Sequence, residues 1–160
     1  MRNKPFNILL LIAVLSAAVF FWWRGRPLNR VRRVLERAAA VATVTLEDNE
    51  IMRRMKASRL RDYAGYEILV DVEGIVRDAT LTQEEAITGW SYAVGIDRFL
   101  LVDFQDIELI DADDERIIIN ATIVVDSNYD GGRYSDSYPV LIELMNVERR
   151  LLVSALKTRL

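Results

Sequence analysis

The chain has 160 residues, 51% of them hydrophobic and 28% charged, which is enough for one globular domain with a buried core. It contains neither Cys nor His, so a Ser-His-Asp triad, a Cys nucleophile, disulfide bonds and zinc sites built from Cys or His are excluded. The net charge of −3 conceals a division: residues 1–37 carry eight basic residues and one acidic residue, whereas residues 38–160 carry 13 basic and 23 acidic residues.

An apolar segment runs from Phe6 to Trp23, with the sequence FNILLLIAVLSAAVFFWW. As a helix that rises about 1.5 Å per residue, it would extend roughly 27 Å, close to the thickness of a bilayer's hydrocarbon core. Basic residues flank it on both sides, and aromatic residues gather at its C-terminal end, where they favour the lipid headgroup region. The sequence predicts a basic tail and membrane anchor over residues 1–26, with a span of about 6–23, and a folded domain over residues 27–160.

This segment has two alternative interpretations. Ser16, Ala17 and Ala18 could form a cleavage site that releases an exported soluble protein, or the segment could be a buried core helix, although no face of it is polar. The positive-inside rule counts more basic residues after the segment than before it and places the domain in the cytoplasm, whereas an apolar stretch at the start of a chain is typical of export. We expect a single-pass protein of the prokaryotic inner-membrane type with an extracytoplasmic domain, and a cytoplasmic domain is the alternative.

The domain is predicted to begin with an amphipathic helix of about 14 residues, for which Asn29 is a candidate N-cap. Apolar residues recur at helical spacing: Val31, Val34, Leu35, Ala38, Val41 and Ala42. Four basic residues before it or on its other face are candidate contacts with anionic lipid headgroups: Arg24, Arg26, Arg30 and Arg33. The alternative is a solvated basic face.

A second helix is predicted after a weak capping box at Thr45–Asp48. Its apolar side would consist of Ile51, Met52, Met55 and Leu60. Its other residues are strongly basic, which would suit phosphate or nucleic acid, but the surrounding domain is acidic, so we expect no nucleic-acid partner.

The remaining elements are predicted from changes in the spacing of apolar residues along the chain. Alternation from Tyr66 to Val72 predicts a half-buried strand, and Thr82 is a candidate cap for a third helix with Ala86, Ile87, Trp90 and Val94 on its apolar face. Four strands in consecutive hairpins are then predicted, starting at about Arg98, Ile117, Tyr138 and Leu151. A slip of phase between Asp103 and Asp106 predicts a bulge in the first of them. The predicted fold class is α+β, with helices on one face of a curved antiparallel sheet.

This order of elements resembles the nuclear transport factor 2-like, or cystatin-like cone, superfamily over about residues 29–160. Three stretches carry the resemblance: Ser58–Ile68, where a helix runs into the first strand; Phe104–Ile110 with Arg116–Ala121, which match the long central hairpin; and Leu151–Lys157, the closing strand. The resemblance implies a pocket between the helices and the sheet, where enzymes of this fold place acid and base groups. It does not imply a reaction, because this fold hosts enzymes, binding modules and assembly subunits.

Six residues are the candidates for such a pocket, among them Asp106. Tyr63, Tyr66, Trp90 and Tyr92 are candidate ligand contacts, and Asp103 is a candidate general base because it shares strand phase with Ile107 and Leu109. The alternatives are that the aromatic residues belong to the core and that Asp103 faces water at the bulge. The acidic turn of Asp111, Asp113, Asp114 and Glu115 lacks the spacing of a calcium loop, so we expect no metal and no cofactor.

These features together predict a single-pass, membrane-anchored and non-catalytic interaction or assembly module. Its partners would be the lipid bilayer and either other proteins or further copies of itself, through the exposed face of the sheet. In plan it is similar to the bitopic assembly subunits of bacterial secretion systems. One alternative is a membrane-tethered protein that binds a small ligand, or acts as an enzyme, in the pocket of the same fold; another is the exported soluble protein.

Overall fold

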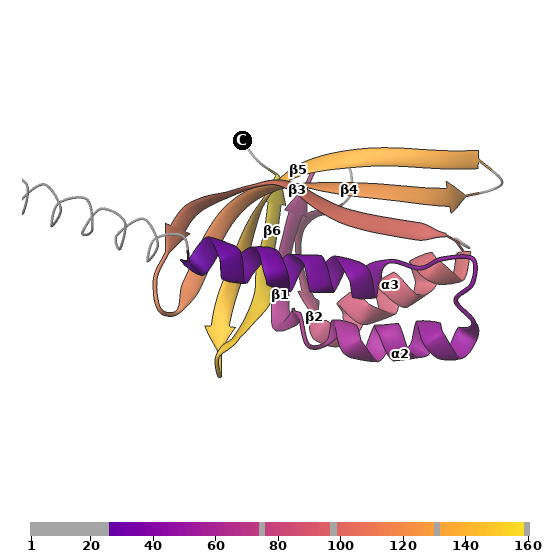
Figure 1. The fold of residues 1–160 in the computed structure, drawn as a ribbon, viewed down its shortest axis with the longest axis horizontal. Coiled ribbons are helices and arrows are strands. Elements are labelled where there is room, and N and C mark those ends of the chain that lie inside the picture. The colour runs from indigo at the N-terminus through magenta and orange to yellow at the C-terminus, as the bar shows by residue number, and fades with distance from the viewer. Residues whose placement is uncertain (1–25, 74–75, 97–98, 130–131, 159–160) are drawn as a thin grey trace, which may run out of the picture.

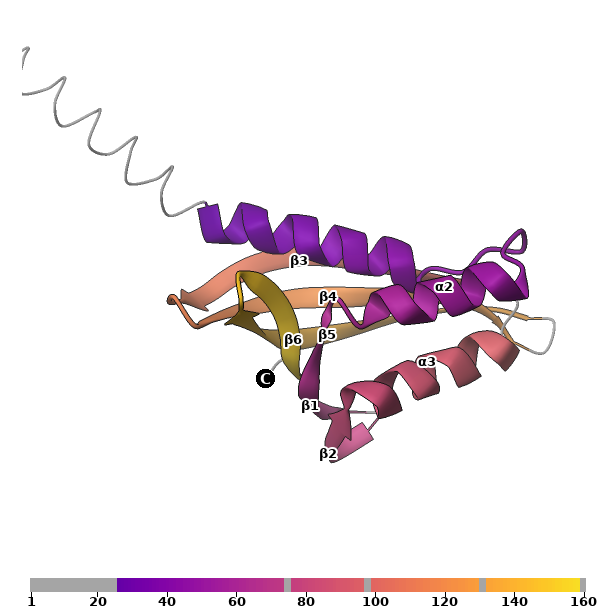
Figure 2. The same ribbon diagram turned by 90° about the horizontal axis from the view of Figure 1, so that it is seen from below.

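The computed structural model describes residues 26–158, apart from residues 74–75, 97–98 and 130–131. These residues form an N-terminal helix over residues 26–42, then two further helices and six strands. The later elements are α2 (Glu50–Leu60), β1 (Ala64–Val72), β2 (Val76–Thr82), α3 (Gln83–Ile96), β3 (Leu100–Ala112), β4 (Arg116–Tyr129), β5 (Gly132–Val147) and β6 (Arg150–Thr158). The helices lie together on one side of the curved sheet (Figures 1 and 2).

The strands form a single sheet in the order β2-β1-β6-β5-β4-β3. The pairs β3–β4, β4–β5 and β5–β6 are antiparallel, which confirms the predicted hairpins. The pair β1–β6 is parallel, contrary to the prediction of a wholly antiparallel sheet. Strand β2 was not predicted because most of its residues are exposed, so it has no apolar alternation, and its last residues were assigned to the start of α3.

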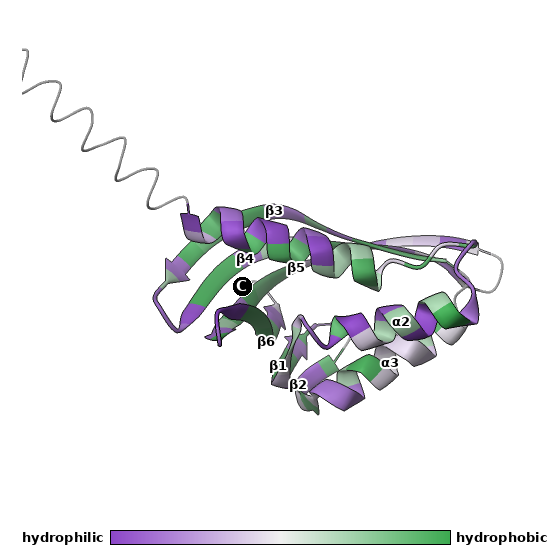
Figure 3. Ribbon diagram, turned by 60° about the horizontal axis from the view of Figure 1, so that its bottom comes forward, coloured by the Kyte–Doolittle hydropathy of each residue, from purple (hydrophilic) through white to green (hydrophobic). Residues whose placement is uncertain are grey.

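The core lies between the N-terminal helix and the inner face of the sheet. Val31 and Leu35 of the helix are fully buried against this face. The alternating residues predicted to point inward from β4 and β5 are buried there: Ile117, Ile119 and Ala121, with Val140, Ile142 and Leu144. Figure 3 shows this hydrophobic lining as green bands on the strands that face the helices. Burial of these side chains at about 25 cal/mol per Å² is the main stabilising contribution to the fold.

The three helix starts differ in how well they were predicted. Thr82 and Glu85 form a reciprocal capping box at α3, because the Thr82 backbone N–H donates to the Glu85 carboxylate (2.8 Å) and the Glu85 N–H donates to the Thr82 hydroxyl (3.3 Å), as the sequence indicated. Asn29 lies inside the first helix instead of capping it. The cap of α2 is Asn49, whose side chain accepts from the Met52 N–H (2.9 Å), four residues after the predicted Thr45.

Two bulges change which residues face the helices. In β3 the register with β4 shifts between Gln105 and Glu108, and Asp106 adopts φ 52°, which confirms the predicted bulge. In β1 the register with β6 shifts between Ala64 and Leu69. The second bulge puts Tyr66 out of phase with the buried residues that follow it.

The predicted membrane span over residues 6–23 lies outside the described residues. Within the described part of the chain, no helix has both the length and the apolar composition that crossing a bilayer requires. The anchor therefore stays a prediction from the sequence.

Candidate functional site

A pocket of about 230 Å³ lies between the helices and the inner face of the sheet, where the resemblance placed it. It is open to solvent on one side, and nearly all of its surface is apolar. All three helices contribute to it, together with strands β1, β3 and β6. Its lining consists of Ala38, Ala42, Leu60, Tyr63, Ala64, Ile68, Ala86, Ile87, Trp90, Val102, Phe104 and Val153.

Small side chains on the helices keep this pocket open. Ala38 and Ala42 of the N-terminal helix and Ala86 of α3 face it, where larger residues would fill the space. The sequence analysis assigned these alanines to ordinary apolar helix faces and did not recognise them as pocket residues. The one sign of a pocket in the sequence was the run of small residues at the end of the first helix. Only the tertiary structure shows that no neighbouring side chain fills the space beside them.

Two of the four predicted aromatic residues line the pocket, Tyr63 and Trp90. The indole N–H of Trp90 donates to the backbone carbonyl of Ala42 (3.0 Å), which fixes the ring between α3 and the N-terminal helix. Of the twelve lining residues, Tyr63 carries the one hydroxyl and none carries a carboxylate or a basic group. The pocket can therefore hold an apolar molecule and offer it a hydroxyl, but its walls supply no acid–base pair.

The other two aromatic residues lie elsewhere, which corrects the predicted set. Tyr92 is 72% exposed on α3, away from the apolar face formed by Ile87 and Val94. Tyr66 is 75% exposed because of the β1 bulge, and it borders a separate shallow hollow beside Met145 and Leu152.

Asp103 is exposed and lies outside the pocket, so it has no access to a ligand there. Its carboxylate accepts from the Phe104 N–H (2.9 Å) and the Gln105 side-chain amide (3.0 Å). The bulge explains this placement: Val102 and Phe104 face the pocket before it, and Ile107 and Leu109 pack against the core after it. Asp103 and Ile107 are an even number of residues apart, yet the bulge between them puts their side chains on opposite faces of the strand.

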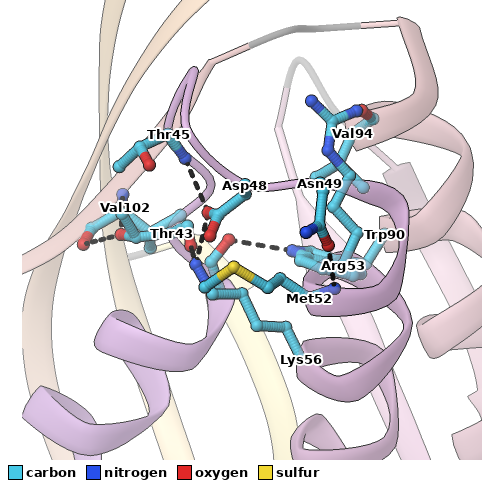
Figure 4. Close-up of polar contacts among 11 residues, drawn as sticks. Thr43, Thr45, Asp48, Asn49, Met52, Arg53, Lys56, Trp90, Val94 and Val102 are labelled. Atoms are coloured by element: carbon cyan, nitrogen blue, oxygen red, sulfur yellow. Dashed lines mark hydrogen bonds and ion pairs between the residues drawn. The ribbon is translucent and has the colours of Figure 1, made fainter.

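A buried ion pair joins α2 to the linker that precedes it (Figure 4). Among the described residues Asp48 is the one charged residue that is buried, and it pairs with Lys56, nearly two turns into the helix. Asp48 also accepts from the Thr45 N–H (2.9 Å), and Lys56 donates to the Thr43 carbonyl (2.8 Å). The hydrogen bond from Lys56 lowers the pKa of Asp48, and the bond from Thr45 lowers it further.

This cluster fastens the linker between the first two helices to the rest of the domain. The Thr43 hydroxyl accepts from the Val102 N–H of β3 (3.1 Å), and the Arg53 guanidinium donates to the Val94 carbonyl at the end of α3 (2.8 Å). Figure 4 shows these contacts converging around the linker. The sequence pattern indicated Asp48 only as the acidic member of a weak capping box and gave no sign of its pairing with Lys56.

The basic residues predicted to contact lipid have different environments. Arg24 lies outside the described residues. Arg26 and Arg33 are exposed, and the Arg33 side chain bonds to the Asn29 carbonyl (3.3 Å). Arg30 is half-buried and donates to the Asn146 side chain (3.2 Å) and to the Arg149 carbonyl, so it links the first helix to the β5–β6 turn. This structural role makes Arg30 unavailable as a simple headgroup contact.

The acidic turn after β3 has a structural explanation. The Asp113 carboxylate accepts from the backbone N–H groups of Arg116 (2.7 Å) and Glu115 (2.8 Å), and these hydrogen bonds close the turn. They also lower the pKa of Asp113. Over the residues that the structure describes, no group of three or more acidic side chains is arranged to hold a metal ion.

Comparisons with known proteins support the architecture. No family model and no curated protein matches the chain. Among solved structures it is similar to Kfla4162 of Kribbella flavida, with 14% identity over 81% of this chain and 87% of that one, and a TM-score of 0.62. It is also similar to a candidate scytalone dehydratase of Novosphingobium aromaticivorans (8% identity, 83% of both chains, TM-score 0.62). A third is Aln2 of a Streptomyces species (15% identity, 82% of this chain and 88% of that one, TM-score 0.59).

The fold is a nuclear transport factor 2-like cone. At these identities the likeness concerns the fold alone, because the same cone carries different activities in different proteins.

Proposed function

We propose that this protein is a membrane-anchored, non-catalytic module that presents its cone domain for binding. The observation that supports a binding role is the composition of the pocket, whose twelve lining residues include no carboxylate and no basic group. Proton transfer at a bound molecule needs a group within about 3 Å whose pKa suits the task, and the pocket walls provide only the Tyr63 hydroxyl. The anchor is the predicted span over residues 6–23.

The anchor is tested with the full-length protein and a variant in which Leu11→Arg and Val14→Arg interrupt the apolar segment. Each charge at the centre of a span costs about 3 kcal/mol of insertion free energy, so the variant should leave the membrane fraction while the wild type resists alkaline extraction. A wild-type protein that alkaline extraction releases would contradict anchoring. The mass of the mature N-terminus separates the anchor from the exported alternative, because cleavage after Ala18 would remove the first 18 residues.

The partner is tested by affinity purification of the full-length protein from detergent-extracted membranes. A stoichiometric protein partner, or a defined oligomer of the chain itself, would support an assembly role. A monomer that carries a bound small molecule would favour the second candidate function instead. A reporter fused after Leu160 assigns the side of the membrane on which the domain lies, for which we propose the extracytoplasmic side.

The second candidate is a membrane-tethered protein that binds a small apolar ligand. The pocket volume of about 230 Å³ favours this function, and because sites for drug-sized ligands span roughly 300–1,000 Å³, the ligand would have to be small. We expect Ala86→Leu to abolish binding of toluene, measured by ligand-detected NMR, because the larger side chain fills the pocket. Ala93→Leu changes an exposed position of the same helix and should leave binding intact. Equal binding by both variants would exclude this pocket as the site.

A further inference from the structure

Helix α2 exposes large hydrophobic residues where a helix of a globular domain ordinarily buries them. Ile51 is 71% exposed, Met52 45% and Met55 51%, and Leu46 in the loop before the helix is 71% exposed. The helix contains no buried residue. The sequence predicted an apolar side made of Ile51, Met52, Met55 and Leu60; Leu60 lines the pocket, whereas the other three are exposed. We name Leu46, Ile51, Met52 and Met55 the α2 apolar surface.

Four residues of α2 are half-buried against the domain, Arg53, Lys56, Ala57 and Leu60, and the two charged ones hold the helix in this orientation. Arg53 donates to Val94 of α3, and Lys56 is held by Asp48 and Thr43. These contacts turn one side of the helix toward the domain. Ile51 and Met55, four residues apart on the other side, are directed outward.

The charges around this surface are those that an anionic membrane attracts. Residues 26–61, which include the N-terminal helix and α2, contain ten basic and four acidic residues, whereas residues 62–160 contain eight basic and 20 acidic residues. Arg59 follows Met55 by one turn, is exposed and forms no ion pair with any described residue. Arg54 is also exposed, and its pair with Glu50 lies in water, where such pairs contribute little.

The position of the predicted span adds a second argument. It ends at Trp23, and the described helix has begun by residue 26, so the domain would be held within a few residues of the lipid surface. Tethering raises the local concentration of lipid at the surface of the domain without any new contact. Apolar side chains among cationic ones, close to a bilayer, match an interfacial helix that inserts its apolar face between headgroups. Figures 1 and 2 show α2 and the N-terminal helix on the same side of the sheet.

We propose that the α2 apolar surface docks on the anionic lipid bilayer in which the chain is anchored, with its large side chains in the interface and Arg54 and Arg59 at the headgroups. This inference rests on the proposed anchor. It assigns to α2 a contact with lipid and leaves the sheet and the pocket free to face partners.

The chain has no cysteine, so single labels are unambiguous. A polarity-sensitive fluorophore is attached at Met55→Cys on the α2 apolar surface, and at Tyr66→Cys as the control on a different exposed surface. The full-length protein is reconstituted in nanodiscs of phosphatidylcholine with or without phosphatidylglycerol, and with lipids that carry a quencher. We expect quenching at position 55 in anionic discs, weaker quenching in neutral discs or at high salt, and none at position 66.

Reversing two charges with Arg54→Glu and Arg59→Glu should lower the ratio of docked to undocked protein by about tenfold or more. Absence of lipid quenching at position 55, in a protein that still resists alkaline extraction, would overturn docking while leaving the anchor intact. A fluorescence change at position 55 that grows with protein concentration and is insensitive to the lipid quencher would also overturn it, because a second copy would then cover this surface.

Discussion

Asp48 and Lys56 form the most consequential polar contact of the described domain, because both charges are largely removed from water. Removing one partner leaves the other uncompensated, so we expect Asp48→Asn to lower the free energy of unfolding by about 3 kcal/mol. Urea denaturation of the detergent-solubilised protein measures this. Glu50→Gln, which breaks the exposed pair with Arg54, is the matched control and should change the free energy by less than about 0.5 kcal/mol.

The contribution of the Asp48–Lys56 pair to stability should depend on pH. Because the hydrogen bond from Lys56 lowers the pKa of Asp48 in the folded protein, its stabilising contribution is complete above the unfolded pKa of about 3.9 and is lost as the pH falls through the lower folded value. The difference in stability between wild type and Asp48→Asn should therefore shrink as the solution is acidified below about pH 4. A difference of the same size at pH 7 and pH 2 would show that the Asp48 charge is not responsible.

Substitution of alanine for glycine should have opposite effects on stability at Gly65 and at Gly89. At Gly65 an added Cβ would lie 2.7 Å from the Val153 carbonyl oxygen, so Gly65→Ala must separate β1 from β6. We expect a loss of about 1–3 kcal/mol, as in other overpacked sites. At Gly89 of α3 an added Cβ meets no atom within 4 Å, and Gly89→Ala should stabilise the helix by about 0.8 kcal/mol. Thermal unfolding of both variants checks the signs, and two shifts in the same direction would contradict this reading of the packing.

At the scale of the element, the start of α2 depends on one side chain. Asn49 accepts the Met52 N–H (2.9 Å), so Asn49→Ala should cost about 1 kcal/mol. Asn49→Ser keeps an acceptor at the same position and should cost only a few tenths of a kcal/mol. Hydrogen exchange of the first-turn amides of α2 provides the local measurement. If both variants behaved alike, the cap would not be the source of the effect.

At the scale of the whole molecule, Arg30 joins parts of the chain that are more than 100 residues apart. Its guanidinium links the N-terminal helix to Asn146 and Arg149 at the β5–β6 turn. Arg30→Met keeps an unbranched apolar stem in place of the arginine stem and removes these bonds, which should cost about 1–2 kcal/mol. Hydrogen exchange at both ends of this link should rise together. Arg32→Met changes an exposed neighbour and should leave exchange unchanged; exchange that rises in both variants would indicate a general effect of lost charge.

Local patterns in the sequence determined much of this protein, because neighbouring residues produce them. Alternation in β4 and β5 identified the strands and their buried side, and Thr82 was identified as the cap at the start of α3. The acidic turn and the bulge near Asp106 were predicted for the same reason. The charge division between the first part of the chain and the rest is also a property of the sequence alone.

Only the tertiary structure decided which side of several elements faces inward. Tyr66 follows the alternation of Ile68 and Val70, yet it is exposed, because the pairing of β1 with β6 shifts register between Ala64 and Leu69. Helix α2 has an apolar side, yet contacts from Lys56 to Asp48 and from Arg53 to α3 turn that side to solvent. Periodicity records that a helix or strand has an apolar face. The direction of that face is set by partners that are distant in the sequence, whose positions no local pattern contains.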